Sequence, residues 1–219
     1  MKELTTFAAK ADDAKFVHLA AQLPDDVAGL IAAAKEAVDA YDGAVMAADT
    51  LAIEQASQRA NDRYAAVIWK LNGNTFFGSR ASDDAPAGII ERHCAAAPGV
   101  APKWGQRGEF LLTVAGMRAV VVVGESMRNH ASMAFHAIDV DRPFLSPTGY
   151  QSHFINPQPG KTIAEVAEAA MSHCIKKCRV PIEPEYRARL TPDRFAWIDN
   201  DLTASEVYEE AAGQMAFTF

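Results

Sequence analysis

The side chains best suited to chemistry lie between residues 136 and 153, in a stretch dense in polar and turn-forming residues. They are His136, Asp139, Asp141, Arg142, Ser146 and His153. Two carboxylates at i,i+2 share one face at a strand end, where they could hold a divalent cation or activate water. The alternative is structural: Asp139 and Asp141 end the strand, and the following Pro and Gly turns dock Phe144 and Tyr150 onto a sheet. Because further carboxylates are missing nearby, the pattern favours the structural interpretation.

Cysteine and histidine form two neighbouring pairs, His93-Cys94 and His173-Cys174, with Cys178 one helical turn beyond the second pair. Thiols at i,i+4 share a helix face and could hold two corners of a zinc site. The CxxC spacing of structural zinc sites is absent, however, and free cysteines are among the most buried residues. We therefore predict core cysteines and no bound metal.

Gly160-Lys161-Thr162 opens a predicted helix, as does the end of a phosphate-binding loop. That loop also needs a glycine where Ile155 stands, and a strand where the chain is rich in proline. Thr162 is better explained as a plain helix cap, and no cofactor is expected.

A small sheet must position these residues, because the strong strand signals surround them. Runs at 110–114, 117–123 and 135–140 are rich in β-branched and aromatic residues. Ala115-Gly116 separates the first two runs and suits a two-residue hairpin turn. The second run includes AVVVV, which has no polar face, so it should be the central strand, covered on both sides.

Helical patterns flank the predicted sheet. Apolar residues at spacings of three and four predict long helices over 27–45 and 53–71, which a tight connection makes into an antiparallel hairpin. Shorter helices are predicted over 3–22, 86–97 and 162–178, with a last one starting at Thr203 or Ser205. The predicted fold is α+β: an N-terminal helical hairpin, a small antiparallel sheet of three to four strands, and C-terminal helices. We divide it into a helical region, 1–73, and an α+β domain, 74–219, which could form one compact unit.

The net charge of −7 is unevenly distributed. Residues 1–62 carry a balance of −6, residues 63–194 of +4 and residues 195–219 of −5. Acidic ends argue against direct nucleic-acid binding, since phosphate contacts supply most of that affinity. They could instead meet a host protein with a basic surface. The predicted binding residues are Asp25, Asp26, Arg142, Tyr150, Glu206, Glu209 and Glu210. Two further options remain. One is a homodimer through the helical hairpin, and the other is DNA binding by the Lys- and Arg-containing residues 176–194.

The composition is that of an ordinary globular protein, with 49% hydrophobic residues in 219. No apolar run approaches the roughly 18 residues of a membrane span, and the N-terminus lacks the apolar core of a signal peptide. Three cysteines fit a reducing compartment. We therefore expect a cytoplasmic protein.

Residues 135–154 resemble a stretch found in small accessory proteins of bacterial conjugative plasmids and related mobile elements. The resemblance rests on His136, Asp139, Arg142-Pro143-Phe144, Ser146 and Thr148-Gly149-Tyr150. Many such proteins are uncharacterised, and some counteract host restriction. The resemblance implies a non-enzymatic protein that binds and inhibits a restriction or CRISPR-type defence protein stoichiometrically. The alternative is a small hydrolase or nuclease that uses His136, Asp139 and Asp141.

Overall fold

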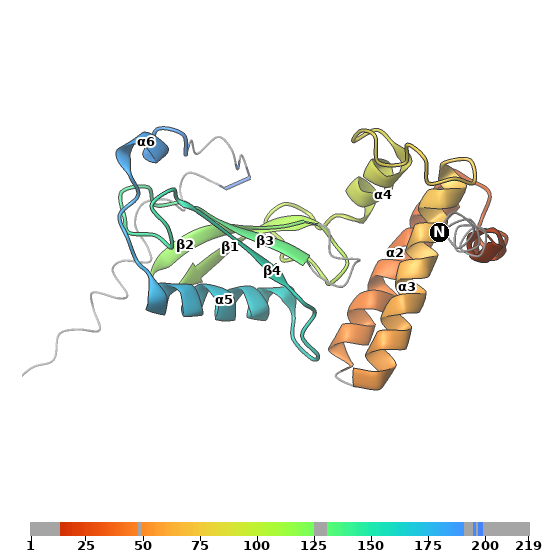
Figure 1. Cartoon of the computed structure of the whole chain (residues 1–219), viewed down its shortest axis with the longest axis horizontal. Helices are drawn as coiled ribbons and strands as arrows, with labels where there is room; N and C mark the ends of the chain where they lie inside the picture. The colour runs from red at the N-terminus through yellow and green to blue at the C-terminus, as the bar shows by residue number, and fades with distance from the viewer. Residues whose placement is uncertain (1–13, 48–49, 125–130, 191–194, 196, 199–219) are drawn as a thin grey trace, which may run out of the picture.

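The structure, a computed structural model, describes residues 14–47, 50–124, 131–190, 195 and 197–198. It has the predicted α+β fold (Figure 1). The elements are α2 (Val27–Met46), α3 (Thr50–Leu71), α4 (Pro86–Cys94), β1 (Gly108–Val114), β2 (Met117–Val123), β3 (Ala131–Ala137), β4 (Tyr150–Ile155), α5 (Ile163–Lys177) and α6 (Pro184–Arg187). Residues 14–20 are also helical, whereas the rest of the predicted first helix up to residue 13, and the last helix, lie outside the described residues. None of the described helices is long and apolar enough to cross a membrane.

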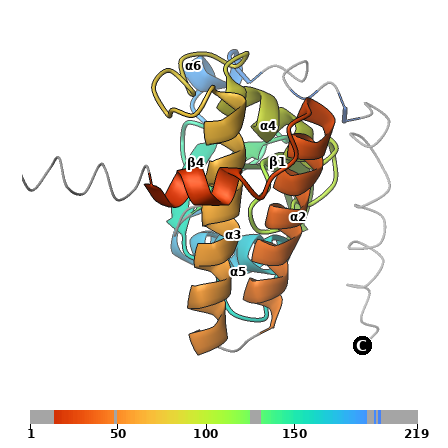
Figure 2. The same ribbon diagram turned by 90° about the vertical axis from the view of Figure 1, so that its right-hand side faces the viewer.

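The helical part comprises residues 14–94, and its centre is the hairpin of α2 and α3. Asp26 caps α2 by accepting a hydrogen bond from the Gly29 N–H at 2.8 Å, which satisfies one of the free donors of the first turn. The apolar faces of α2, α3 and α4 meet in one cluster, which includes Ala34, Val67 and Ile90, all fully buried. Helical residues 14–20 lie across the hairpin (Figure 2).

The sheet part comprises the described residues from 95 to 198. Its four strands form an antiparallel sheet in the order β1-β2-β3-β4. Ala115 and Gly116 both have positive φ, as the predicted two-residue turn requires. Val120 and Val121 on β2 point to opposite faces and are both fully buried, which confirms the covered inner strand.

The third strand is displaced from its prediction, since β3 covers Ala131–Ala137 instead of 135–140. Its start was not predicted because Ala131, Ser132 and Ala134 carry no strand preference. Its end comes early because the chain turns at residues 139–142, where the Arg142 N–H donates to the Asp139 carbonyl at 3.1 Å. The fourth strand, β4, begins directly after the turn residues.

Helix α5 covers one face of the sheet. Thr162 and Glu165 form a capping box at its start, which confirms the predicted cap. Ile163, Val166 and Met171 then point into a core shared with β1, β2 and β3. On the opposite face, the Phe195 ring lies 5.6 Å from the ring of His136.

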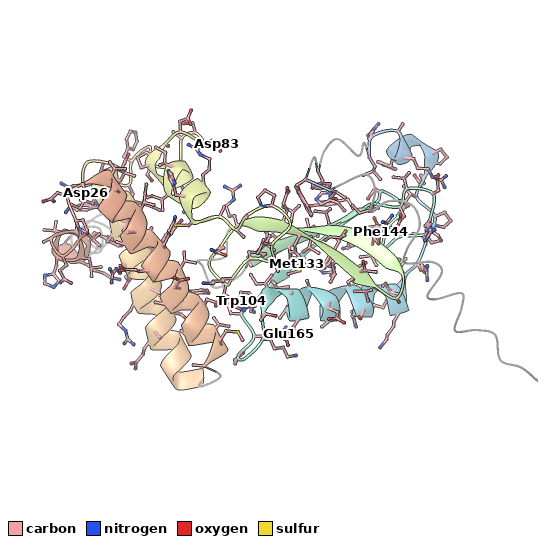
Figure 3. The ribbon with its side chains drawn as sticks, turned by 180° about the vertical axis from the view of Figure 1, so that it is seen from behind. Asp26, Asp83, Trp104, Met133, Phe144 and Glu165 are labelled. Carbon is pink, nitrogen blue, oxygen red and sulfur yellow. The ribbon has the colours of Figure 1, made fainter. Side chains whose placement is uncertain are left out.

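Trp104 joins the helical part to the sheet part and is completely buried (Figure 3). Its backbone N–H donates to the Asp42 carboxylate on α2 at 2.9 Å, and its indole N–H donates to the Lys161 carbonyl at 2.7 Å. Nearby, the Gly160 N–H donates to the Val45 carbonyl at 2.8 Å. Tyr41, Val45 and Ala60 of the hairpin belong to the same buried cluster as the sheet core. We call this contact the joint.

Candidate functional site

The sheet separates the two histidines of the predicted cluster. His136 pairs with Val120 and Tyr150, whereas His153 pairs with Met133. Positions 133 and 136 have opposite parity on β3, so the two imidazoles lie on opposite faces. His136 is buried, with its ring centroid 5.0 Å from that of Tyr150. The structure therefore does not bring His136 and His153 to one site.

The two aspartates also have different surroundings. Asp139 accepts two hydrogen bonds from the Arg118 guanidinium, one of them from Nε at 3.0 Å. Both side chains are mostly buried, with exposed fractions of 14% for Arg118 and 18% for Asp139. Asp141 is 89% exposed and lies 3.6 Å from Arg187. Among the described residues, no group of three or more His, Cys, Asp and Glu side chains could hold a metal ion.

The segment after β3 makes many contacts within the fold. Phe144 and Leu145 are buried in the core, and Phe144 forms a β-bridge with Val180. The Ser146 hydroxyl donates to the Tyr150 carbonyl at 2.7 Å, which turns the chain into β4. A side chain at Gly149, whose φ is +69°, would meet Leu190 at 2.4 Å. The segment thus has a clear structural use, while the predicted binding role of the half-buried Arg142 and of Tyr150, 45% exposed, stays a prediction.

His153 on β4 and Cys174 on α5 form a thiol–imidazole pair. Cys174 Sγ lies 3.3 Å from His153 Nε2. Burial raises the pKa of the Cys174 thiol, and burial together with the nearby His173 lowers the pKa of His153. Both shifts favour the neutral forms, so the thiol is not activated as a nucleophile.

The lowered pKa of His153 predicts that acid destabilises the protein. Since the folded state disfavours the imidazolium, this contribution to stability is present above the ordinary His pKa of 6.5 and is lost as pH falls through the folded pKa. Urea unfolding at pH 7.5 and 5.5 should show a smaller free energy of unfolding at pH 5.5. His153→Asn should reduce this difference. An unchanged pH dependence in the variant would contradict the assignment to His153.

The other two cysteines differ in their exposure to solvent. Cys94 is buried in the helical cluster, where burial raises the pKa of its thiol to about 11. Cys178 ends α5 and is exposed. Cys94 is therefore a core cysteine as predicted, whereas Cys178 is not.

The predicted acidic binding residues that the structure describes have local partners. Asp26 caps α2, and Asp25, fully exposed, lies 2.7 Å from Lys70 Nζ. The predicted binding residues Glu206, Glu209 and Glu210 lie outside the described residues.

Most cations of the helical part are neutralised by neighbouring acids. Of the seven Lys and Arg residues between 15 and 93, five form ion pairs: Lys15–Asp62, Arg63–Glu36, Lys70–Asp25, Arg80–Glu91 and Arg92–Asp84. Lys35 on α2 and Arg59 on α3 are exposed and form no ion pair with described residues. Arg59 shares an exposed face of α3 with Gln55, four residues before it, and the adjacent Gln58 is exposed as well.

Comparison with known proteins matches both parts of the chain to one family. Residues 15–93 match the KlcB N-terminal DNA-binding domain, and residues 107–197 match the KlcB third domain. Two Escherichia coli proteins, each called Protein KlcB, are similar to the chain. One is 49% identical over 177 residues, covering 79% of this chain and 43% of the relative. The other is 42% identical over 189 residues, covering 85% of this chain and 40% of the relative.

The chain thus spans less than half the length of the curated relatives it matches. No solved structure matches it. The family match confirms the resemblance to plasmid accessory proteins, while the antirestriction link stays a prediction.

The match corrects the prediction that direct nucleic-acid binding is unlikely, because the family model that matches residues 15–93 is that of a DNA-binding domain. The error came from using net charge as the criterion. Binding depends on the local field, and five of the ten described acids of the helical part pair with its own cations, while Lys35 and Arg59 stay outside these ion pairs. The sequence QASQRANDR at 55–63 is rich in the kinds of side chain that contact DNA, and the prediction gave it no weight.

Proposed function

We propose that this chain, which matches the KlcB N-terminal domain over residues 15–93 and the KlcB third domain over residues 107–197, is a plasmid accessory protein of that family and binds DNA through its helical part. The observation that carries the proposal is the match of residues 15–93 to the family's DNA-binding domain. The matched range includes α4, which packs on the hairpin, so the proposed DNA-binding unit is the hairpin together with α4. The predicted division at residue 73 stays a prediction.

The exposed face of α3 is the surface we propose for DNA. An exposed helix face can enter the major groove, where arginine bonds guanine and glutamine bonds adenine. Arg59 and Gln55 are exposed on this face, and Gln58 lies beside them with its amide donating to Asp62 at 2.9 Å. Arg63, one turn from Arg59, lies 2.6 Å from Glu36 on α2. Arg59 can therefore reach DNA without first breaking an ion pair among the described residues.

Arg59→Ala is expected to weaken DNA binding. Loss of a bidentate guanine contact would weaken binding by about 1–3 kcal/mol. Loss of a phosphate contact would reduce the magnitude of the salt slope, the slope of log K against log salt concentration, by about 1. Fluorescence anisotropy with a labelled duplex of the plasmid's own DNA, at several salt concentrations, measures both quantities.

Arg92→Ala is the matched control, because Arg92 lies in the same matched range but pairs with Asp84. This variant should bind DNA like the parent. Equal affinity of the Arg59 variant and the parent would exclude the α3 face, and a parent that binds no duplex at low salt would refute the proposed function.

Inhibition of a restriction or CRISPR-type defence protein stays a prediction. The family match supports a plasmid accessory role without naming a protein target. A hydrolase or nuclease using His136, Asp139 and Asp141 has little support from the geometry, since Asp139 is engaged by Arg118 and no group of these residues could hold a metal.

A further inference from the structure

The end of α5 carries three exposed cations within four residues. Lys176 and Lys177 lie in the last turn, and Arg179 follows Cys178, the C-cap. None of the three forms an ion pair with another described residue, unlike most cations of the helical part. We call these three residues the basic segment.

The basic segment is held in place by the chain that follows it. Val180 forms a two-way β-bridge with Phe144, with N–O distances of 2.8 and 2.9 Å. Ile182 is buried in the sheet core. Because positions 180 and 182 are anchored, Arg179 projects from a fixed backbone at the surface. A fixed cation loses less conformational freedom on binding than one on a mobile tail.

The helix dipole offers a simpler explanation for two of the three cations. Lysines near a helix C-terminus are favoured by about 0.3–1 kcal/mol each, so Lys176 and Lys177 could serve stability alone. That explanation does not extend to Arg179, which lies beyond the C-cap Cys178. The helix-dipole explanation also predicts that substituting these lysines lowers stability, whereas a binding role does not.

We propose that the basic segment is a second DNA contact, which binds backbone phosphates of the duplex held by the helical part. This inference rests on the proposed function. The partner is DNA because the chain is acidic overall, at −7, yet these three cations form no ion pair with an acid among the described residues. Phosphate contacts need such cations and read no sequence.

The fold sets where this contact lies. Helix α5 starts at the joint, where Lys161 and Gly160 contact the indole of Trp104 and the Val45 carbonyl, and runs away from the hairpin (Figure 1). Its 15 residues extend about 22 Å at 1.5 Å each. A duplex that contacts both regions must therefore extend well beyond the α3 face.

The test compares salt slopes of DNA binding for two double variants of the whole chain. Lys176→Ala/Arg179→Ala removes two proposed phosphate contacts. Lys103→Ala/Arg92→Ala removes the same charge from cations that pair with Asp39 and Asp84. Each phosphate contact contributes about 0.9 to the slope of log K against log salt. The duplex has 20 base pairs of mixed sequence. The Lys176/Arg179 variant should reduce the magnitude of the salt slope by about 1.8. The Lys103/Arg92 variant should have the slope of the parent.

Thermal melting of both variants separates binding from stability. Equal melting temperatures with a reduced slope only in the Lys176/Arg179 variant support the proposal. A parent-like slope in that variant, with the parent binding DNA, overturns the second contact and leaves the proposed function standing. A lower melting temperature of the Lys176/Arg179 variant with a parent-like slope assigns these cations to the helix dipole. That result also overturns the second DNA contact. A parent that binds no DNA overturns the proposed function and this inference together.

Discussion

Replacing Trp104 with alanine should lower the free energy of unfolding by about 3–5 kcal/mol, the range for removing a buried large aromatic side chain. The indole is fully buried at the joint and donates to the Lys161 carbonyl at 2.7 Å. The variant loses its packing against Tyr41 and Val45 and leaves the Lys161 carbonyl without the indole donor. Urea unfolding followed by circular dichroism measures the change.

Phe77→Ala is the matched control, since Phe77 is 92% exposed and its loss should change stability by less than about 0.5 kcal/mol. Trp104→Phe should fall between the two, because it keeps a ring but loses the hydrogen bond. If Trp104→Ala unfolds like the control, the helical and sheet parts do not depend on the joint.

Arg118→Ala should destabilise the protein by about 2–3 kcal/mol. The guanidinium holds Asp139 with two hydrogen bonds at a mostly buried site, and removing one partner leaves the other charge poorly compensated. Asp139→Asn should have a smaller effect, because an amide can still accept a hydrogen bond from Arg118. Thermal and urea unfolding of both variants measure the difference.

Replacing both partners should cost less than the sum of the single changes, because neither charge is then left alone. Asp141→Ala is the control, since Asp141 is 89% exposed and its ion pair contributes little. If Arg118→Ala leaves stability unchanged while DNA binding is lost, the pair belongs to a binding surface.

The sequence predicted the elements whose patterns are strong. Apolar spacing defined α2 and α3, the Ala115-Gly116 turn defined the β1–β2 hairpin, and Thr162 marked the start of α5. The start of β3 was missed, because Ala131 and Ser132 carry no strand preference and are fixed by pairing with Ile155 and Phe154. Pairing with a distant strand is tertiary information that local propensity does not contain.

The prediction that His136 and His153 belong to one cluster was wrong for a related reason. Residues 136 and 153 are close in sequence, yet the register of β3 and β4 places them on opposite faces. Arg118, the partner of Asp139, lies 21 residues away and could not be identified before the sheet was known. DNA binding was judged unlikely because the net charge of the whole helical region was counted, whereas Lys35 and Arg59 lie exposed outside its ion pairs.

The joint also bears on how this chain relates to its longer relatives. In this chain, the segments that match the KlcB N-terminal and third domains are separated only by residues 94–106. Trp104 lies within this short segment and bonds to both parts. Trp104 therefore holds the helical part at a defined position relative to α5, and a duplex bound as proposed would take the same position.

Hydrogen–deuterium exchange of the whole chain, with and without a 20-base-pair duplex, tests DNA binding by the helical part most directly. The account predicts slower exchange around Arg59 in α3, and around Arg179 if the second contact forms. It predicts unchanged exchange in β2, at the centre of the sheet. Slower exchange confined to the sheet part, or no change at saturating DNA, would contradict DNA binding through α3.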